Sequence, residues 1–266
     1  MIPNRARENN IKMFQETIKL YHDSLKTSDN LVENEYFPVD RLLKPILPKT
    51  EYPECQIKVS NQKSFEMARP FSLAGKKVCV LNFASATNPG GGVENGANAQ
   101  EEDLCRCSTL YPFLIAPNVS DYYKTHREAH DPLYDDACIY TSNVTVIRDD
   151  RNGKLLTPSE YYVVDVITCA APNLRLTHIT NQQLYELHKQ RAKRILDIAA
   201  YKNADVVILG AFGCGAFKND PEVVARTYKD ILKYYQHTFE TICFAVYDTQ
   251  IIGNKYDLFK KVIIDF

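Results

Sequence analysis

The sequence carries no excess of charge of either sign and has no long apolar run. Its 266 residues include 32 Lys and Arg and 33 Asp and Glu, a formal net charge of −1 at pH 7. This balance gives no general attraction to nucleic acid or to an anionic membrane, so local groups would have to hold any polyanionic ligand. No apolar stretch approaches the length that spans a bilayer, and residues 1–10 are polar, unlike a signal peptide. We therefore expect a folded protein with no membrane partner.

Metal-binding and disulfide patterns are missing as well. The eight cysteines are scattered without Cys-x-x-Cys spacing, and most lie beside apolar residues, where a free thiol behaves as a small buried hydrophobe. His126 and His130 are spaced to share a helix face, but no third ligand accompanies them, and we expect a solvated polar face there. We predict no metal site. Reduced thiols without a secretion signal indicate an intracellular protein, cytoplasmic or, in a eukaryote, nuclear.

From residue 56 onward, apolar runs alternate with helical patterns. Strands are predicted at 56–59, 78–83, 138–147 (one or two strands around Ser142 and Asn143), 161–169, 205–209 and 241–246. Helices are predicted at 61–68, 100–110, 180–202, from 221 and at 255–264. Strands that alternate with helices indicate a mainly parallel sheet covered on both faces, in one domain.

The first 55 residues follow a different pattern. Residues 1–28 place apolar side chains at intervals of three and four, which predicts a helix with one packing face; they are Ile11, Phe14, Ile18, Tyr21 and Leu25. Residues 30–53 contain four prolines and are expected to form an irregular segment wrapped over the fold. We treat residues 1–55 as an accessory segment of a single domain that spans residues 1–266.

Residues 82–110 are the most informative stretch. The consecutive glycines Gly90, Gly91 and Gly92 follow a predicted buried strand, where they permit positive φ, close approach of a ligand, and N–H groups that hold an anion such as a pyrophosphate. After seven intervening residues, Gln100 opens a predicted helix and is followed at once by two carboxylates. Acidic residues in a first helical turn are ordinary, because the helix dipole favours negative charge there. The significance of these two carboxylates therefore depends on their combination with the glycine run.

A second glycine loop follows a second predicted strand. It contains Gly213, Cys214, Gly215, Ala216 and Phe217, and the cap and proline of a helix start come directly after it. Two such loops would meet at the carboxyl edge of a parallel sheet and could hold a pyrophosphate from both sides. Neither loop ends in Gly-Lys-Ser/Thr, so magnesium-dependent hydrolysis of the P-loop kind is not expected.

The spacing of Gly-Gly-Gly, seven residues and Gln-Glu-Glu resembles the signature of microbial-type (bacterial-type) poly(ADP-ribose) glycohydrolases, which are macrodomain-like proteins. The resemblance also covers residues 170–175, 209–221 and 244–248. It implies a three-layer α/β/α fold with a mainly parallel mixed central sheet and an extra N-terminal helical segment. It further implies a glycosidase, without cofactor or metal, that cleaves ribose–ribose O-glycosidic bonds in poly(ADP-ribose) or ADP-ribosylated proteins and releases ADP-ribose.

Site residues are carried over from this resemblance by position. Glu102 would be the catalytic acid, and Glu101 would hold ribose hydroxyls. The remaining residues implied to bind substrate are Gly90, Gly91 and Gly92, Asn88 and Gln100 at the loop and sugar, Gly213, Cys214, Gly215 and Ala216 at the diphosphate, Phe217 at the terminal ribose and Tyr247 at the adenine. A core or rim aromatic accounts for Tyr247 equally well.

The expected reaction passes through an oxocarbenium-like transition state. Adjacent carboxylates rarely face each other across a bond, which favours a mechanism with a single carboxylate. Glu102 would protonate the leaving hydroxyl and then accept a proton from the attacking water, while the substrate's diphosphate steadies the positive ring. To hold that proton near neutrality, Glu102 needs burial and the neighbouring Glu101.

Two alternatives remain open at the level of sequence. One is an enzyme that releases a single ADP-ribose from a protein or a small molecule. The other is a non-catalytic module that binds ADP-ribose, although such a module has no need of the acid. We expect a monomer, and the sequence does not decide between chain-end and internal cleavage.

Overall fold

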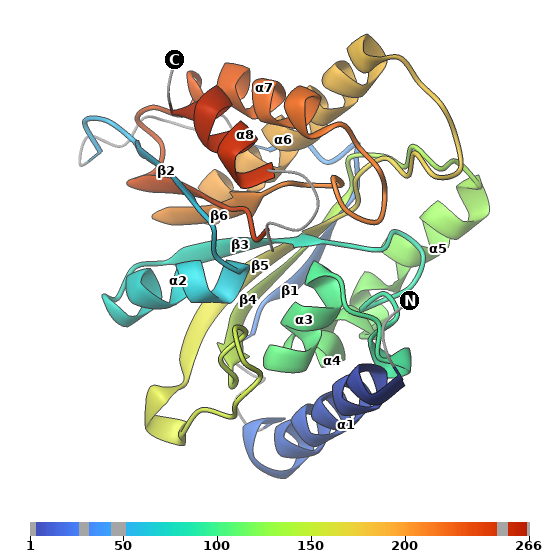
Figure 1. The fold of residues 1–266 in the computed structure, drawn as a ribbon, viewed down its shortest axis with the longest axis vertical. Coiled ribbons are helices and arrows are strands. Elements are labelled where there is room, and N and C mark those ends of the chain that lie inside the picture. Colours follow the sequence, from blue (N-terminus) through green and yellow to red (C-terminus); the bar gives the residue numbers. More distant parts are fainter. Residues whose placement is uncertain (1–3, 27–31, 44–51, 249–254, 265–266) are drawn as a thin grey trace.

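The computed structural model describes residues 4–26, 32–43, 52–248 and 255–264, which form a central sheet between two layers of helices (Figure 1). The strands are β1 (Asn34–Phe37), β2 (Gln56–Ser60), β3 (Val78–Phe83), β4 (Cys138–Val146), β5 (Tyr162–Cys169), β6 (Val206–Gly210) and β7 (Thr241–Ala245). The helices are α1 (Asn4–Leu20), α2 (Ser64–Leu73), α3 (Gln100–Cys107), α4 (Leu110–Leu114), α5 (Ser120–Ala129), α6 (Asn181–Tyr201), α7 (Pro221–Leu232) and α8 (Lys255–Ile263).

The strand order in the sheet is β1-β4-β5-β3-β6-β7-β2. The pairs from β5 to β2 are parallel, whereas β4 pairs antiparallel with both β5 and β1. The expected mainly parallel mixed sheet is therefore confirmed. Because β3 and β6 are parallel neighbours, the two glycine loops that follow them leave the same edge of the sheet side by side.

Alternate residues of the central strands pack into separate cores on the two faces. Along β3, Val78 and Val80 pack with α2 and α3, whereas Cys79 and Leu81 pack with α6, α7 and α8. Since successive side chains of a strand point to opposite faces, a strand buried on both sides must be apolar throughout. The continuous apolar runs in the sequence have this origin, and they produce the three-layer α/β/α architecture.

Helix α1 packs against the elements that carry the glycine loop and the adjacent carboxylates. Phe14 and Thr17 are its buried residues, and the Thr17 hydroxyl donates to the carbonyl of Arg106 on α3 at 2.6 Å. Arg7 Nε donates to the carbonyl of Asn95 at 2.7 Å. The helix continues as one π-helical turn over Tyr21–Leu25. The predicted packing helix is therefore confirmed, and it lies behind the loop between β3 and α3.

Parts of the chain differ from the sequence-based expectations. Residues 34–37, within the segment expected to be irregular, form the edge strand β1 with Phe37 fully buried. Its partner β4 lies about a hundred residues along the chain, so no local pattern indicates the pairing. Residues 44–51 lie outside the described residues. The helix expected at 100–110 is interrupted at Ser108, whose backbone is extended, and resumes as α4.

Two further boundaries are also shifted. Helix α2 begins at Ser64 and runs through Pro70 to Leu73, five residues beyond the predicted end. Strand β4 is continuous across the doubtful point but carries a bulge between Thr141 and Val144, where Asn143 has a positive φ of 51°. The extra residue of a bulge breaks the alternation of sides, which is why the sequence suggested one or two strands.

The expected solvated face around His126 is wrong. His126 is buried on α5, with Nδ1 2.7 Å from the Tyr122 carbonyl and Nε2 2.9 Å from an Asp135 carboxylate oxygen. His130 is exposed and ends the helix with a left-handed backbone. The charged and polar positions of the sequence do not reveal that Asp135, in the following turn, folds back onto this histidine.

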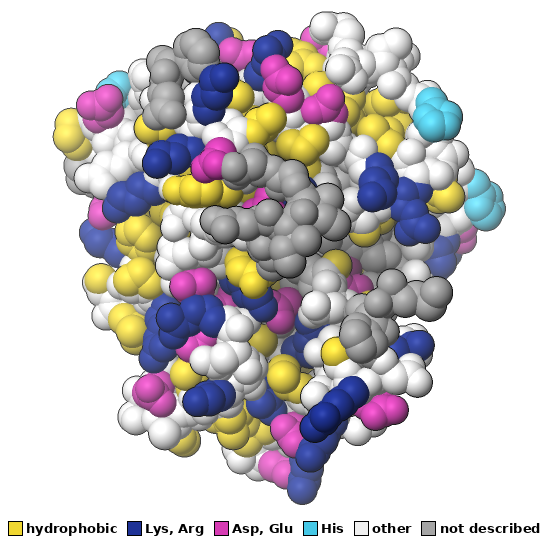
Figure 2. All heavy atoms as spheres, in the orientation of Figure 1, with side chains coloured by type: hydrophobic (Ala, Val, Ile, Leu, Met, Phe, Trp, Pro, Cys, Tyr) yellow, Lys and Arg dark blue, Asp and Glu magenta, His cyan; other side chains and the backbone are white. Residues whose placement is uncertain are grey.

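The eight cysteines are all free and buried, as apolar surroundings predict. No helix within the described residues combines the length and apolar character needed to cross a bilayer. On the face seen in Figure 2, basic and acidic side chains are interspersed over most of the surface, in line with the balanced composition.

Candidate active site

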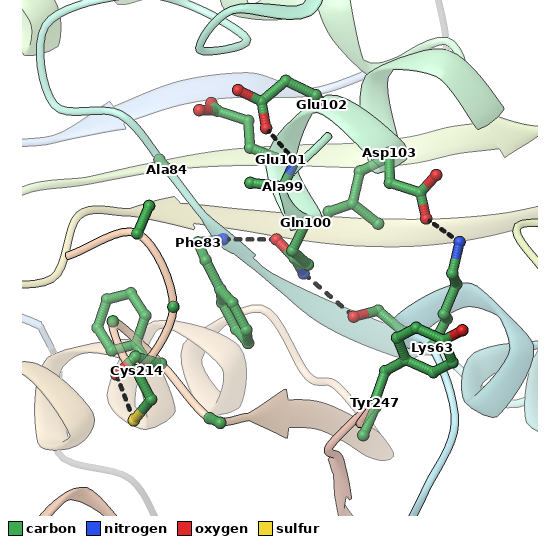
Figure 3. A pocket seen from close by; sticks show the side chains of 18 of the residues that line it. Lys63, Phe83, Ala84, Ala99, Gln100, Glu101, Glu102, Asp103, Cys214 and Tyr247 are labelled. Carbon is green, nitrogen blue, oxygen red and sulfur yellow. Dashed lines mark hydrogen bonds and ion pairs between the residues drawn. The ribbon is translucent and has the colours of Figure 1, made fainter. Parts of the chain in front are cut away.

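A cavity of about 710 Å³ lies where the loops after β3, β6 and β7 meet the start of α3 (Figure 3). It brings together most of the predicted site residues, namely Gly91, Gln100, Glu101, Glu102, Gly213, Cys214, Gly215, Ala216, Phe217 and Tyr247. Three others, Asn88, Gly90 and Gly92, do not line it. A cavity of this size accommodates a ligand as large as a dinucleotide.

The Glu102 carboxylate is held by two backbone N–H groups. One oxygen accepts from Gly92 N–H at 2.9 Å, and the other accepts from Ala99 N–H, also at 2.9 Å. The second bond is half of a capping box at the start of α3. Each oxygen keeps a second lone pair, so the group is fixed in position and still able to carry a proton. The side chain is buried at 8% exposure yet lines the cavity.

Position 91 has no room for a side chain, because the carboxylates of Glu101 and Glu102 occupy the space that it would fill. A Cβ atom there would lie 2.5 Å from Glu102 Oε1 and 3.1 Å from Glu101 Oε2. Its φ of 60° is also in the left-handed region that favours glycine. The N–H of Gly91 donates to the Asn88 carbonyl, and the next N–H donates to Glu102. The anion that this loop binds in the structure is thus the Glu102 carboxylate.

Glu101 is buried deeper than its neighbour, at 2% exposure. Its oxygens accept from Ser85 N–H at 2.7 Å and from Asn82 Nδ2 at 3.3 Å. Burial, partly opposed by the Ser85 N–H bond and reinforced by the adjacent Glu102 charge, raises the pKa of Glu101 to about 8. Glu101 therefore retains its proton to near-neutral pH.

Gln100 joins α3 to β3. Its Nε2 donates to the Leu81 carbonyl at 2.8 Å and to the Ser64 hydroxyl at 3.1 Å, while its Oε1 accepts from Phe83 N–H at 2.8 Å. These three bonds use both ends of the amide. The structure therefore places Gln100 as a clamp that fixes the start of α3 against the sheet, with its amide turned to protein partners.

The predicted residues outside the cavity support the first glycine loop. Gly90 packs on the ring of Tyr111, which a Cβ atom would approach to 2.6 Å. Gly92 supplies the N–H for Glu102. Asn88 is exposed, and its N–H donates to the Ser85 hydroxyl at 3.1 Å. Asn88 does not line the cavity, and its expected contact with the sugar remains a prediction.

The second glycine loop offers free amides to the cavity. Among the described residues, the N–H groups of Gly215, Ala216 and Phe217 have no protein acceptor, and Gly215 has open space around its Cα. Such a row of amides is suited to a diphosphate. Cys214 directly precedes them, and burial raises the pKa of its thiol, so it is not a thiolate nucleophile.

Asn219 and His188 fix the shape of that loop. Asn219 Nδ2 donates to the carbonyls of Pro172 and Phe217 at 2.7 and 3.2 Å, and its Oδ1 lies 2.6 Å from His188 Nε2. Burial lowers the pKa of His188 to about 4, so the ring is neutral and its Nε2–H donates to Asn219. Neither residue was singled out from sequence.

Tyr247 and Lys63 form the part of the cavity remote from the carboxylates (Figure 3). The Lys63 ammonium lies 5.6 Å from the centre of the exposed Tyr247 ring and 2.9 Å from an Asp103 oxygen. Burial opposes the charge of Lys63, but Asp103 outweighs it and raises the lysine pKa. Asp150 caps α2 by accepting from Phe65 N–H at 2.9 Å. Burial and Asp103 raise the pKa of Asp150 to about 7.

Sequence reasoning missed Lys63, Asp103 and Asp150 because they lie far apart in the chain and have no shared spacing. Within the described ranges, no three His, Cys, Asp or Glu side chains gather at distances that would hold a metal ion. The cavity thus combines an oriented carboxyl pair, a row of free amides and an exposed aromatic ring.

Comparison with known proteins supports this description. The model of the microbial-type PARG catalytic domain matches residues 8–149, more than half of the chain. No curated protein sequence matches the chain. The crystal structure of poly(ADP-ribose) glycohydrolase (PARG) from Thermomonospora curvata is similar at 30% identity and a TM-score of 0.86, covering 96% of this chain and 100% of that one.

Two similar structures contain ligands. The Thermomonospora curvata enzyme bound to the inhibitor ADP-HPD aligns with a TM-score of 0.82 at 30% identity, over 96% of this chain and 99% of that chain. PARG from Deinococcus radiodurans in complex with ADP-ribose aligns with a TM-score of 0.78 at 33% identity, over 91% and 98%. Fold and cavity together define a macrodomain-like hydrolase. The chain belongs to the microbial-type PARG family, the glycohydrolases of poly(ADP-ribose).

Proposed function

We propose that the protein cleaves the ribose–ribose O-glycosidic bonds of poly(ADP-ribose) with Glu102 as general acid and base, and that it needs no metal ion. The observation that carries this proposal is the fixed Glu102 carboxylate, held by Gly92 N–H and Ala99 N–H at 2.9 Å each and facing the cavity. Both oxygens are oriented by protein donors, so a cation is not required to place them. We further propose a single catalytic domain that acts as a monomer.

The substrate's position follows from the cavity walls. The terminal ribose would lie between Gly91 and Phe217, within reach of the carboxyl pair. The diphosphate would accept from the free amides of Gly215 and Ala216. The adenine would stack on Tyr247, whose ring is 56% exposed. ADP-ribose, which a solved Deinococcus structure holds, would be the product that occupies all three positions.

The chemistry uses one carboxyl group twice. Glu102 protonates the departing ribose oxygen as the glycosidic bond breaks, and the diphosphate, held by the amides of the second glycine loop, stabilises the oxocarbenium-like ring. Glu102 then accepts a proton from the water that attacks the anomeric carbon. Glu101 holds ribose hydroxyls and, with its pKa of about 8, keeps a proton in the pair at neutral pH.

Release of ADP-ribose from automodified poly(ADP-ribose), in the presence of a chelator, tests the proposal. Glu102→Ala should reduce the rate by roughly 10² to 10⁴ fold, the usual contribution of a general acid or base, while ADP-ribose binding persists. Glu222→Ala is the matched control, because Glu222 also lies in the first turn of a helix, α7, and does not line the cavity. That variant should keep the parent rate.

Other outcomes would assign a different activity. A parent protein that binds ADP-ribose but releases none from the polymer would be a binding module or an enzyme for a single ADP-ribose. Release from mono-ADP-ribosylated protein alone would identify the latter. Loss of activity on addition of the chelator would contradict the metal-independent mechanism.

A further inference from the structure

Three exposed cationic side chains lie on segments that border the Phe217 end of the cavity: Arg127, Arg175 and Lys218, here called the cationic rim. Arg127 Nη1 donates to the Thr87 carbonyl at 2.6 Å and so touches the loop that leads to Gly91. Lys218 directly follows Phe217, which lines the cavity. The rim thus adjoins both loops that enclose the reacting sugar.

Backbone contacts bring Arg175 to the same place. Leu174 N–H donates to the Phe217 carbonyl at 2.9 Å, which sets Arg175 beside Lys218. Asn173 N–H donates to the Pro132 carbonyl at 2.8 Å, which joins this loop to the segment after α5. Figure 2 shows Lys and Arg side chains gathered over α5 and the loop after β6, in contrast to the mixed charges elsewhere.

Lys218 has an energetically unfavourable backbone conformation, and its side chain is exposed to solvent. Its φ of 62° is left-handed, a conformation that disfavours a lysine by about 1 kcal/mol. The turn is held by Lys218 N–H, which donates to the Gly215 carbonyl at 3.2 Å. As a result Phe217 faces the cavity while Lys218 faces solvent. Within the described residues, none of the three rim cations forms an ion pair.

Nearby acidic side chains are engaged elsewhere. Asp131 accepts a backbone N–H within its own turn, and Asp135 pairs with His126 at 2.9 Å. Glu128 lies four residues after Lys124 on α5, so these two opposite charges share one side of the helix and offset each other. The rim therefore retains its positive charge even though the whole chain has a net charge of −1.

We propose that the cationic rim binds the diphosphate of the second ADP-ribose unit, the one that carries the leaving hydroxyl. This rests on the proposed function, because Glu102 protonates that hydroxyl and the leaving unit must extend outward from it. The leaving unit would extend between Gly91 and Phe217, which both line the cavity, toward the exposed side chains of the cationic rim. A diphosphate carries two negative charges, which guanidinium and ammonium groups bind well. The cationic rim thus gives the enzyme a binding contact with the polymer that a single ADP-ribose does not make.

Binding measurements in a Glu102→Ala background separate this proposal from catalysis. The probes are ADP-ribose and a purified poly(ADP-ribose) oligomer of about three units. The test variant adds Arg175→Gln and Lys218→Asn, since asparagine removes the charge and tolerates the left-handed backbone. Arg127 is left intact because it also holds the Thr87 carbonyl. The control variant carries Lys260→Gln and Lys261→Gln, two exposed lysines of α8.

The background protein should bind the oligomer more tightly than ADP-ribose, and the rim variant should lose most of that preference. The slope of log affinity against log salt should fall by about 1 for each cation removed. Affinity for ADP-ribose should stay unchanged in both variants. Equal oligomer preference and salt slope in the rim and control variants, or no preference at all in the background protein, would overturn the proposal. Release of ADP-ribose by the parent, measured separately, reports on the proposed function alone.

Discussion

The Cα atom of Gly91 lies directly against the carboxylate of Glu102, so that a Cβ atom would fall 2.5 Å from Oε1. The same Cβ atom would fall 3.1 Å from Glu101 Oε2. Position 91 therefore has no room for a side chain next to the two carboxyl groups. Glycine leaves this space to the Glu102 carboxylate and also adopts the left-handed backbone conformation found here.

Replacing Gly91 by alanine should displace Glu102 from its two N–H donors. We expect kcat to fall by roughly 10² fold or more, because a catalytic group moved by about 1 Å loses that much. The change should appear in kcat more than in KM, since the second glycine loop and Tyr247 still hold the nucleotide. Steady-state release of ADP-ribose measures both constants.

A glycine outside the cavity wall separates the possible causes of that loss. Gly75→Ala has open space but a φ of 78°, and it lies outside the cavity wall. It should cost about 1 kcal/mol of stability without affecting kcat. A Gly91→Ala enzyme as active as the Gly75→Ala enzyme would show that the carboxylates adjust without loss.

The raised pKa of Glu101 predicts a stability that depends on pH. A carboxyl group with a pKa of about 8 in the folded protein and near its ordinary value of 4.5 in the unfolded chain binds its proton more tightly in the folded protein. Its contribution is complete below the unfolded pKa and is lost as pH rises through the folded pKa. Between about pH 5 and pH 8, the parent should therefore lose more stability than Glu101→Gln, which cannot titrate there.

Urea unfolding of both proteins across that range gives the difference directly. Asp150, with its pKa raised to about 7, contributes in the same direction in both proteins and cancels in the comparison. A difference in unfolding free energy that stays constant with pH would show that Glu101 is ionised in the fold.

Tyr247 is predicted to bind the adenine by stacking. Its ring is 56% exposed at the cavity wall, beside the Lys63 ammonium. Tyr247→Ala should weaken ADP-ribose binding by about 1 to 3 kcal/mol, the usual contribution of one stacked base, while Tyr247→Phe keeps most of the affinity. Calorimetric titration with ADP-ribose measures this. Tyr234→Ala, at another exposed tyrosine, is the matched control. Equal ADP-ribose affinity in all three variants would show that Tyr247 does not bind the adenine.

The central strands and the two glycine loops were predictable because their signals are local. A strand buried on both faces is apolar throughout, and a helix start after a glycine loop carries its own cap, as Asp220 does for α7. The adjacent glutamates were placed by resemblance to a family, and the structure sets both at the cavity. These features need no knowledge of which distant segment they meet.

Features that depend on distant pairing were not predictable. The edge strand β1 is defined by β4, and Lys63 is placed at the cavity by Asp103 on α3. Gln100 was expected at the loop and the sugar, but no spacing in the sequence indicates that its amide bonds to Leu81, Phe83 and Ser64. Sequence spacing fixes which residues are close along the chain, whereas these contacts join segments that only the fold brings together.

Helix α1 is bonded to the loop that joins the three glycines to α3. Arg7 and Asn10 donate to the carbonyls of Asn95 and Gly96, in the middle of the segment that joins the glycines to α3. A Cβ atom on Gly96 would lie 2.4 Å from the Arg7 carbonyl, so the two backbones are pressed together. From outside the cavity, helix α1 thus stabilises a loop whose two ends, Gly92 and Ala99, donate their N–H groups to Glu102. If Glu102 is the acid, as proposed, helix α1 would help to hold it in place, although no described residue of α1 lines the cavity.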